Sequence, residues 1–410
     1  MTEWIGAAEA ARRLGIKQAS LYSYVSRGVL TRRRGTAGRA SLFDASEVAG
    51  LARKGRPRRA PGTSELTVES ELTEITADQL RYRGHDATRL AAESSFEDVA
   101  GLLWTGVLGG GPGAERWRAR DQAAAAGRAA QAGLPPGTLP LERLQVIVPA
   151  LAATDQFRLH LDPPAVIAAA CALIGGMVGC LPVPGPGQEP RPAPGAEPGP
   201  VAGRLLSRLR PGPPEPRLER VLGAALVLLA DHELAASTLA VRIAASVRAD
   251  PYAVVATGLG ALGGALHGGA SLGAESMLGS AAGPADAPRV VGELLRRGER
   301  IPGLGHLIYQ AGDPRAVLLL GLIRQAAPGS AALAVADAVL AETRARALPE
   351  ANMDFALAVL AGVAGMIPGA GEAIFAIART AGWVAHALEE YARRSPIRPR
   401  SVYIGPPALP

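Results

Sequence analysis

Apolar positions recur along most of this 410-residue chain at the three- and four-residue spacing that is typical of helices. Two strongly apolar runs, at residues 218–230 and 237–247, predict long helices, and the polar residues Asp231, His232 and Glu233 lie between them. No internal repeat occurs, and a strand-like pattern is confined to a short region near the N-terminus. The pattern therefore predicts a mostly α-helical protein.

The first 55 residues follow a pattern of their own. Residues 7–14 and 18–27 predict two short helices with a glycine-containing turn between them. A basic hairpin is predicted at residues 31–43, and Asp44 is placed to cap a further helix. This order of helix, turn, helix and basic wing resembles the winged helix-turn-helix of the MerR/excisionase type, which binds DNA.

The resemblance implies a DNA-binding surface in this segment. Four side chains of the second helix would lie near a DNA groove, namely Gln18, Ser20, Tyr22 and Ser23. Four arginines would face phosphates, namely Arg32, Arg33, Arg34 and Arg39. The alternative is a small helical docking module whose basic face is solvated.

Charge divides the chain at the same place. Residues 1–60 carry 13 Lys and Arg against 4 Asp and Glu, whereas the remainder carries 30 against 33. The whole basic excess therefore belongs to the N-terminal segment, which indicates an anionic partner there. Residues 56–64 are basic and contain Pro and Gly, so we expect a linker. Residues 181–216, also rich in Pro and Gly, predict an insertion that is mostly loop.

Composition narrows the class of protein. Charged residues make up 20% and apolar residues 48% of the chain, as in folded globular proteins. Cys171 and Cys180, the only cysteines, share one apolar segment without metal-ligand spacing. A disulfide framework and a structural zinc site are therefore not expected.

One apolar segment raises the question of a membrane span. Residues 165–183 carry no charge, but they are rich in Ala and Gly and end in a Pro/Gly loop. We therefore expect a buried helix, with Gly175 and Gly179 allowing a neighbouring helix to approach closely. The N-terminus has no signal-peptide h-region, so we expect a cytoplasmic protein.

The sequence IPGLGHLIYQAGDPR, at residues 301–315, is the most informative stretch. Its early Pro and Gly residues oppose a helix and predict a tight loop that presents His306. Asp313 and Pro314 predict the start of a helix, which fixes Arg315 nearby. An imidazole and a guanidinium at such a loop suit a ligand that bears a carboxylate.

Other residues add to this chemistry. His232 follows an apolar helix, His267 lies among glycines in GALGGALHGGA, and Asp354 precedes another apolar helix. Arg379 and Arg398 lie at the starts or ends of predicted elements. Each histidine alone is more often structural than catalytic. Together these groups supply a base, hydrogen-bond donors and carboxylate clamps, which can remove a proton beside a carbonyl and stabilise the oxyanion.

Seven motifs in one order resemble the citrate synthase family. They are RYRGHD (81–86), SSFEDVAGLLWTG (94–106), HELAAST (232–238), GALHGGA (264–270), the loop at 301–315, ANMDFA (351–356) and RTAGWVAHALEE (379–390). The resemblance covers about residues 65–405. It implies a helical homodimer with a large domain, residues 65–268 and 364–410, and a small mobile domain, residues 269–363.

The resemblance also implies an activity and roles within it. The family condenses acetyl-CoA, or another short acyl-CoA, with oxaloacetate, and no metal or redox cofactor is implied. Asp354 matches the base, His267 the donor to the thioester oxygen, and His306 the residue that polarises the oxaloacetate ketone. The positions that bind oxaloacetate are matched by His232, Arg315, Arg379 and Arg398 of the partner subunit. The strip that reads the CoA adenine is matched by Pro302, Gly303, Leu304 and Gly305.

The chain departs from the family pattern at four positions. Ala235 and Ser271 stand where the family usually has Asn, whose amide helps to order the active-site loops. Leu307 and Gln310 stand where many bacterial members have a basic residue near the CoA phosphates. These departures bear on the CoA affinity and on the substrate.

Two function classes stay open. In the first, the chain is an enzyme, a citrate synthase of the si type or a 2-methylcitrate synthase. In the second, it is a DNA-binding regulator whose synthase-like domain senses a ligand. Joint retention of Asp354, His267 and His306 favours the enzyme, because a sensor needs the arginines but not the base.

Overall fold

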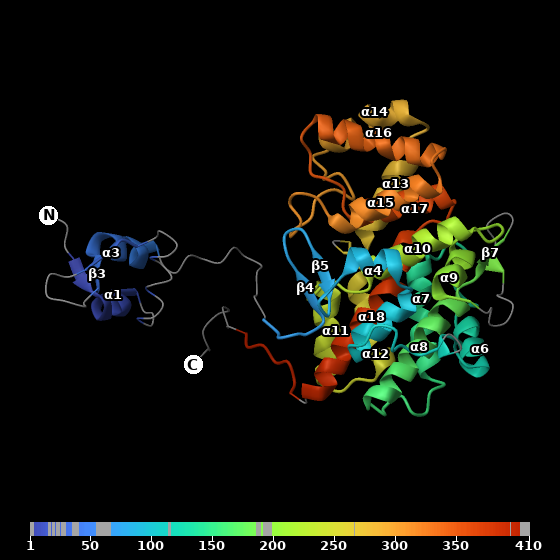
Figure 1. The fold of residues 1–410 in the computed structure, drawn as a ribbon, viewed down its shortest axis with the longest axis horizontal. Coiled ribbons are helices and arrows are strands. Elements are labelled where there is room, and N and C mark those ends of the chain that lie inside the picture. Colours follow the sequence, from blue (N-terminus) through green and yellow to red (C-terminus); the bar gives the residue numbers. More distant parts are fainter. Residues whose placement is uncertain are drawn as a thin grey trace, which may run out of the picture. The chain divides into compact units, whose positions relative to one another are not determined.

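The computed structural model describes residues 4–14, 18, 21, 25, 30–34, 41–54, 67–113, 116–185, 190–191, 199–265, 267–393 and 395–401. The chain divides into two compact units, Met1–Val68 and Glu69–Pro410. Helices make up most of the second unit, which confirms the mostly α-helical class (Figure 1).

The first unit combines a small antiparallel sheet with two helices. Its strands β1 (Trp4–Gly6), β2 (Arg32–Arg34) and β3 (Ser41–Asp44) pair in the order β1-β3-β2. Its helices are α1 (Ala7–Leu14) and α3 (Ala45–Lys54). The predicted first helix, the basic hairpin and the helix after the Asp44 cap are therefore confirmed. The strand β1 was not predicted, because three residues are too few to show an alternating pattern.

The predicted second helix of this unit is described at three positions. Gln18, Leu21 and Val25 are all helical there, and Leu21 is fully buried in a small core with Phe43 and Val48. Four predicted DNA-binding residues lie outside the described residues, namely Ser20, Tyr22, Ser23 and Arg39. The predicted linker at residues 56–64 also lies outside them.

The second unit begins with a sheet that the sequence pattern missed. The strands β4 (Thr73–Ile75), β5 (Leu80–Tyr82) and β6 (His85–Asp86) pair antiparallel in chain order. They are too short for their alternation to be recognised in the sequence. Helices α4 (Ala87–Glu93) and α5 (Phe96–Thr105) follow.

The remaining helices of the second unit include a long central one, α18. Their bounds are α6 (Asp121–Ala129), α7 (Pro140–Ala152), α8 (Pro163–Cys180), α9 (Val201–Leu209), α10 (Pro216–Leu229), α11 (Ala236–Ser246), α12 (Pro251–Leu262), α13 (Gly269–Gly279), α14 (Ala287–Arg296), α15 (Pro314–Ala326), α16 (Ala331–Ala345), α17 (Met353–Ala364) and α18 (Ala370–Arg393). A short 3-10 helix, Pro284–Asp286, precedes α14.

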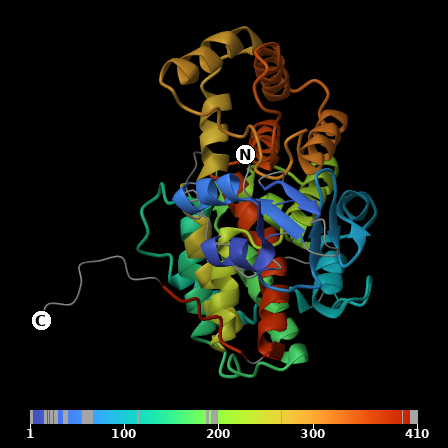
Figure 2. The ribbon, with the colours of Figure 1, turned by 90° about the vertical axis from the view of Figure 1, so that its left-hand side faces the viewer.

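Helix α18 forms the axis of the second unit. It packs against α5, α7, α8, α10, α11 and α12, and it is buried on nearly all sides from Ala370 to Ala387. Figure 2 shows it as the long red helix that runs through the unit. Gly258 on α12 allows one of these close contacts, because a Cβ there would lie 2.7 Å from the Trp383 ring. A helix this central can hold several loops of the site at fixed positions.

Helix α8 is the apolar segment that raised the membrane question. It is long and apolar enough to cross a membrane by length and composition, and more than half of it is buried inside the protein, as expected for a core helix. Gly175 meets the Trp117 backbone, since a Cβ would come within 2.2 Å of the Trp117 carbonyl oxygen. The expected close approach at Gly179 is wrong, because nothing lies within 4 Å of its Cβ position. Gly176, against Leu151, takes that role.

The predicted insertion at residues 181–216 is not a loop throughout. Helix α9 lies within it, and seven of its nine residues are buried because Leu205, Leu206 and Leu209 pack into the core. Two short paired strands, β7 (Val183–Pro184) and β8 (Pro190–Arg191), precede it. Helical periodicity resumes within the insertion at residues 201–209, which are the bounds of this helix.

Helices α13 to α17 lie together at one end of the second unit (Figure 1). Residues 365–369 lead from α17 into α18 and contain two glycines in the left-handed region, Gly365 at φ 62° and Gly369 at φ 77°. The Ile367 N–H donates to the Leu209 carbonyl oxygen at 2.8 Å, which fixes this connection to the end of α9. The division of this unit into a large domain and a small mobile domain, residues 269–363, stays a prediction.

Candidate active site

The glycine loop at residues 301–305 lies against the segment that precedes Asp354. The Gly305 N–H donates to the Glu350 carbonyl oxygen at 2.8 Å, and the Asn352 N–H donates to the Gly303 carbonyl oxygen at 2.9 Å. Gly303 has φ +78°, and a Cβ there would lie 2.8 Å from the Phe355 side chain. The predicted tight, bare-backbone loop is therefore confirmed.

Asn352 joins this loop to the start of α17. Its side-chain oxygen caps the helix by accepting from the Asp354 N–H at 2.9 Å and the Phe355 N–H at 3.4 Å. Its amide nitrogen donates to the Gly305 carbonyl oxygen at 2.9 Å. Asp354 is thereby fixed in the first turn of α17, beside the loop that carries His306.

His306 is oriented by the backbone that follows it. Its Nδ1 accepts from the N–H of Ile308 at 3.1 Å and from that of Tyr309 at 3.3 Å. The ring proton therefore lies on Nε2, which is free to donate. Burial, and next the Arg315 charge, lower the pKa of His306, so the ring is a neutral donor at neutral pH.

Tyr309 connects three predicted site residues. Its hydroxyl lies 3.2 Å from His232 Nε2, and its ring centre is 4.8 Å from that of His306. The centres of the His232 and His306 rings are 5.3 Å apart. Burial and the nearby Arg315 and Arg379 charges lower the pKa of His232 well below its ordinary value, so this imidazole is also neutral.

Arg315 is held rigidly at the start of α15. Asp313 caps that helix, as predicted, and its carboxylate binds the guanidinium through Nε at 3.0 Å and NH2 at 2.7 Å. Both residues are buried. The guanidinium lies 5.4 Å from the centre of the Tyr309 ring. The arginine therefore lies beside the histidine cluster, which is formed by His232, His306 and Tyr309.

Arg379 and His267 both lie against the ring of Phe375. The Arg379 guanidinium stacks 4.6 Å from the centre of the Phe375 ring, whose other neighbour is His267 at 5.7 Å. Arg379 Nε donates to the Leu229 carbonyl oxygen at 2.8 Å, while its buried NH1 has no hydrogen-bond partner among the described residues. This guanidinium therefore keeps an open donor for an anion.

His267 is kept neutral by its surroundings. Burial, and next the Arg379 charge, lower the pKa of His267 to about 4. The Ser237 hydroxyl lies 2.8 Å from His267 Nε2, and when it donates there the ring proton lies on Nδ1. The ring then offers a neutral N–H toward the site.

The pKa of Asp354 is shifted upward, whereas those of the three histidines are lowered. Burial raises the pKa of Asp354 to about 6, although the Arg315 charge counteracts part of that effect. A carboxylate of this pKa is a stronger base than an exposed one and is still mostly ionised at neutral pH. The site thus combines a tuned carboxylate with neutral imidazoles.

Six of the predicted catalytic and substrate-binding residues converge in this way. The Arg315 charge lies close enough to lower the pKa of His232 and of Asp354, and the Arg379 charge lowers the pKa of His232 and of His267. Arg398 of this chain is not among them. It is exposed, and its neighbour Ile397 donates to Ser246 at the far end of α11.

The residues that depart from the family pattern make few polar contacts. Ala235 is the N-cap of α11 and provides no side-chain cap. Ser271 is buried, and its hydroxyl has no hydrogen-bond partner among the described residues. Leu307 is 93% exposed beside His306, and the nearby Gln310 is also exposed. The first two positions thus lack the amides that would brace the loops.

Several residues of the site were not found from the sequence. Tyr309, Ser237, Phe375 and Asn352 each contact a predicted residue, and Asp313 was predicted as a cap but not as the partner of Arg315. Only the Asn352 position carried a usable signal, as an N-cap residue before an apolar helix. In the part of the chain that the structure describes, no group of three His, Cys, Asp or Glu side chains could hold a metal ion.

Comparisons with known proteins agree with this arrangement. Residues 63–400 match the family described as "Citrate synthase, C-terminal domain". The citrate synthase of Acidithiobacillus ferridurans is 32% identical over 375 residues, which cover 85% of this chain and 96% of that protein. Citrate synthase 2 of Bacillus subtilis is 30% identical over 363 residues, covering 83% and 94%. The crystal structure of the Thermotoga maritima citrate synthase superposes with a TM-score of 0.67 at 25% identity, over 84% of this chain and 94% of that one.

A helical fold that brings a tuned carboxylate, neutral imidazoles and buried guanidiniums together suits an enzyme that removes a proton beside a carbonyl and binds a substrate with carboxylates. The chain belongs to the citrate synthase family. Its activity is a citrate-synthase-like condensation of an acyl-CoA with oxaloacetate.

Proposed function

We propose that this protein condenses acetyl-CoA, or another short acyl-CoA, with oxaloacetate and then hydrolyses the citryl-CoA thioester, with the si stereochemistry. The observation that carries the proposal is the convergence of Asp354, at a pKa of about 6, with the neutral rings of His267 and His306. These are the groups that enolisation and carbonyl attack require. Oxaloacetate and the acyl-CoA are the substrates, and no resident cofactor takes part.

The first step is removal of a proton from the acyl methyl group. The Asp354 carboxylate takes this proton, and its raised pKa makes it a better acceptor. Negative charge then develops on the thioester oxygen. The His267 N–H donates to that oxygen, and as a neutral ring held by Ser237 it is already in place.

The second step is attack of the enol carbon on the oxaloacetate ketone. His306 Nε2 donates to the ketone oxygen, since its Nδ1 is already occupied by two backbone N–H groups. Arg315 and Arg379 bind the oxaloacetate carboxylates, and His232 adds a further contact. The open NH1 of Arg379 and the Asp313-braced fork of Arg315 suit that role.

The glycine loop would meet the CoA. Both backbone groups of Gly305 already bind residues 350 and 352, so the CoA adenine would use the backbone groups that stay open at Pro302, Gly303 and Leu304. The exposed Leu307 and Gln310 provide no cation for the CoA phosphates. We therefore expect a weaker dependence of CoA binding on salt than a basic residue at these positions would give.

The test is a thiol-release assay with oxaloacetate and either acetyl-CoA or propionyl-CoA. Release with acetyl-CoA that depends on oxaloacetate supports the proposal, and the ratio of kcat/KM for the two thioesters assigns the acyl group. Absence of oxaloacetate-dependent release with either thioester contradicts it.

The oxaloacetate site is completed by a second copy of the chain. We place Arg398 of the partner subunit at a carboxylate of oxaloacetate, because this chain's own Arg398 lies away from the histidine cluster. The active form is then a homodimer, and we assign it to the cytoplasm.

A second activity is proposed for the first unit, namely DNA binding by a winged helix-turn-helix. Strand β2 includes the exposed Arg32 and Arg33, and the Arg33 guanidinium stacks 4.5 Å from the centre of the Trp4 ring. Thr31 is tied to Glu47 of α3 through its N–H and its hydroxyl, at 2.6 and 2.9 Å. A braced, arginine-bearing hairpin suits contacts to phosphates.

Fluorescence anisotropy of the full chain with DNA duplexes tests this second activity. Because phosphate contacts release counterions, binding should weaken steeply between low and near-physiological salt. Substituting Ala for both Arg32 and Arg33, or starting the chain at Ser64, should abolish it. Equal binding by all three proteins, or none by any of them, contradicts DNA recognition.

A further inference from the structure

Asp231 lies directly behind His232 and holds the turn that carries it. Asp231 is fully buried, and its Oδ2 accepts from the Thr73 hydroxyl at 2.6 Å and the Glu233 N–H at 3.1 Å. Glu233 has φ 54°, a left-handed conformation that is strained for a non-glycine residue. The turn keeps this shape because Asp231 binds it from within.

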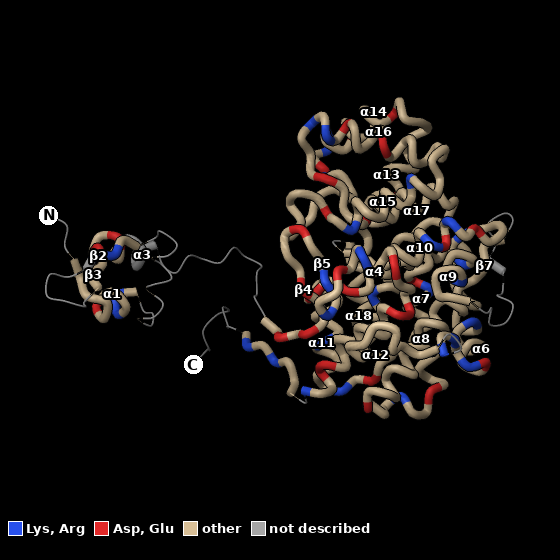
Figure 3. The backbone as a smooth tube through the Cα atoms, viewed as in Figure 1, with Lys and Arg blue, Asp and Glu red and all other residues tan. Residues whose placement is uncertain are grey.

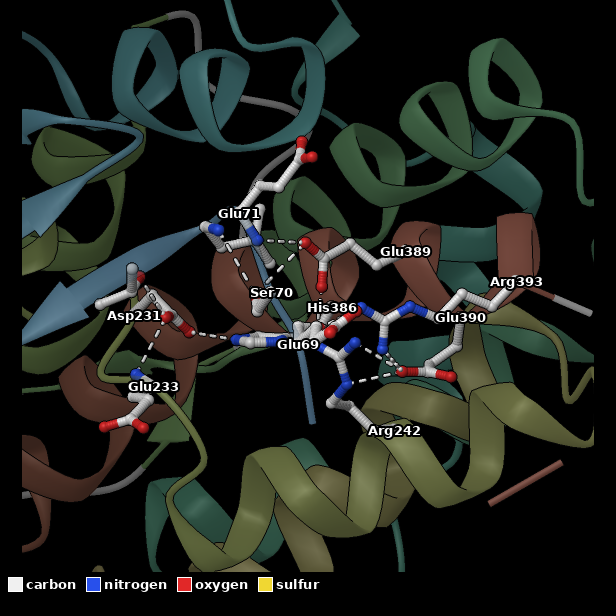
Figure 4. A network of polar contacts seen from close by, with 12 residues as sticks. Glu69, Ser70, Glu71, Asp231, Glu233, Arg242, His386, Glu389, Glu390 and Arg393 are labelled. Carbon is white, nitrogen blue, oxygen red and sulfur yellow. Dashed lines mark hydrogen bonds and ion pairs between the residues drawn. The ribbon is translucent and has the colours of Figure 1, made fainter. Parts of the chain in front are cut away.

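Helix α18 contacts the same turn, residues 231–233, through a second set of residues (Figure 4). The Gly382 N–H donates to the Ala230 carbonyl oxygen at 3.0 Å, and His386 Nε2 lies 3.2 Å from Asp231 Oδ1. The contact requires glycine at 382, because a Cβ would come within 2.4 Å of the Ala230 and Asp231 oxygens. Positions 379, 382 and 386 share one face of α18 at helical spacing, so the helix that carries Arg379 also fixes the neighbour of His232.

Arg242 determines which way His386 faces. Its NH1 lies 2.5 Å from His386 Nδ1 and also donates to Glu389 at 2.7 Å, while its Nε donates to Glu390 at 2.7 Å. A guanidinium only donates, so Nδ1 accepts and the imidazole proton lies on Nε2, toward Asp231. Burial would raise the pKa of Asp231, but His386 and then Arg379 and Thr73 outweigh it and hold that pKa below its ordinary value.

The network also reaches the first residues of the second unit. Glu389 accepts from the Glu71 N–H at 2.8 Å and the Ser70 hydroxyl at 3.2 Å, and Arg393 donates to the Glu69 carbonyl oxygen. The segment that enters the unit is therefore tied to α18 on the same side as Asp231 (Figure 4).

We propose that Asp231 and His386 are positioning residues for oxaloacetate, which act by holding His232 in its binding place, with Thr73 as their support from the entering segment. The inference rests on the proposed function, because it assigns His232 to oxaloacetate. A core filled by apolar side chains could stabilise the fold as well as these buried charges do. The polar network also orients His232, because its hydrogen bonds hold the 231–233 turn in one conformation.

Two amide substitutions at one position separate positioning from packing. In His386→Gln the amide nitrogen reaches the place of Nε2 and can still donate to Asp231. In His386→Asn the amide reaches only the place of Nδ1, so it accepts from Arg242 and leaves Asp231 without that contact. We expect His386→Asn to weaken oxaloacetate binding about ten- to hundred-fold, the range seen when outer partners of a binding histidine are removed. We expect His386→Gln to stay within about twofold of the wild type.

The measurements are the Kd for oxaloacetate of the full chain by calorimetry, the KM values for both substrates, and the Tm. A purely structural role would lower the Tm in both variants and leave the oxaloacetate Kd unchanged, which would overturn the proposal. Thr73→Val should raise the Kd in the same direction by about threefold. Thr76→Val is its control, because that hydroxyl binds only the exposed Asp78 in the same hairpin.

Different results would contradict the proposed condensation and the positioning role. Wild-type protein that binds oxaloacetate without releasing thiol contradicts the proposed condensation, while the Kd series still decides the positioning role. Wild-type activity combined with an unchanged Kd in His386→Asn contradicts the positioning role alone.

Discussion

Asp354 should control the pH dependence of the reaction. Its folded pKa of about 6 lies above its ordinary value because of burial, so the carboxylate gains a proton as the pH falls through 6 and the base is lost. We therefore expect kcat/KM for the acyl-CoA to rise between about pH 5 and 7 and then level off. His267, with a pKa of about 4, stays neutral over that range, so it should add no second pH-dependent step to the rate profile.

A pH–rate profile of the full chain measures this limb. Glu372→Gln is a useful control, because burial raises the pKa of Glu372 to about 7 and that carboxyl could be mistaken for the base. The limb near pH 6 should persist in this variant. A profile that is flat from pH 5 to 7 contradicts the assignment of Asp354.

Arg315 should determine how much oxaloacetate the enzyme needs. Arg315→Leu removes a buried guanidinium, and truncation of one partner of a buried charge pair costs about 2–5 kcal/mol. We expect a large rise in the KM for oxaloacetate and a lower Tm, since Asp313 is left buried and unpaired. Arg315→Lys keeps the charge without the planar fork, so its KM for oxaloacetate should lie between those of the wild type and Arg315→Leu. An unchanged KM for oxaloacetate in Arg315→Leu contradicts the clamp.

At the residue level, the sequence predicted the reactive groups better than their neighbours. His267, His306 and Asp354 were predicted because their motifs are distinctive, and the structure places them with the arginines. Tyr309 and Phe375 carry no such signal, because an aromatic side chain has the same pattern in a core as in a site. Their roles depend on contacts between segments far apart in the chain.

The glycine loop is the element whose geometry the site depends on most. In Gly303→Ala the new Cβ would meet Phe355 at 2.8 Å at a φ of +78°, so the loop must shift away from α17. We expect a loss of about 1–3 kcal/mol in the free energy of unfolding and a fall in kcat. Denaturant unfolding and steady-state kinetics measure the two effects.

Gly321→Ala provides the matched control within α15. Nothing lies within 4 Å of its Cβ position, and alanine favours a helix over glycine by about 1 kcal/mol. This variant should be as stable as the wild type or more so, and equally active. Equal stability of Gly303→Ala and Gly321→Ala would show that the loop is not held as described.

Elements with long apolar periodicity were predictable, and short ones were not. Helices α10 and α11 begin and end within about two residues of the predicted runs. The strands β1 and β4 to β6 contain two or three residues each. Such elements are formed by tertiary packing, which a local pattern does not record.

At the scale of the whole molecule, the distribution of charge follows the division into two units. Lys, Arg, Asp and Glu are interspersed along the second unit in Figure 3. The basic excess lies within residues 1–60. The order of the motifs predicted the family of the second unit, whereas residues 1–60 were interpreted from one short pattern, and their part in DNA binding stays a prediction.

A shared site between two subunits should be detectable by mixing defective proteins. Dimers of Arg398→Leu lack the partner's clamp, and dimers of Asp354→Asn lack the base. A hybrid dimer regains one site in which both residues are intact, so co-expression of the two variants should restore part of the wild-type activity. No recovery in a sample shown to contain hybrid dimers contradicts the shared site.

The most direct test of the account compares the wild type with Asp354→Asn in oxaloacetate-dependent thiol release from acetyl-CoA, together with the Kd for oxaloacetate. The substitution removes the base and leaves the arginines and histidines in place. We expect kcat to fall by several orders of magnitude while the oxaloacetate Kd stays nearly unchanged. Equal thiol release by the two proteins would contradict the central claim that Asp354 carries out the condensation chemistry in this chain.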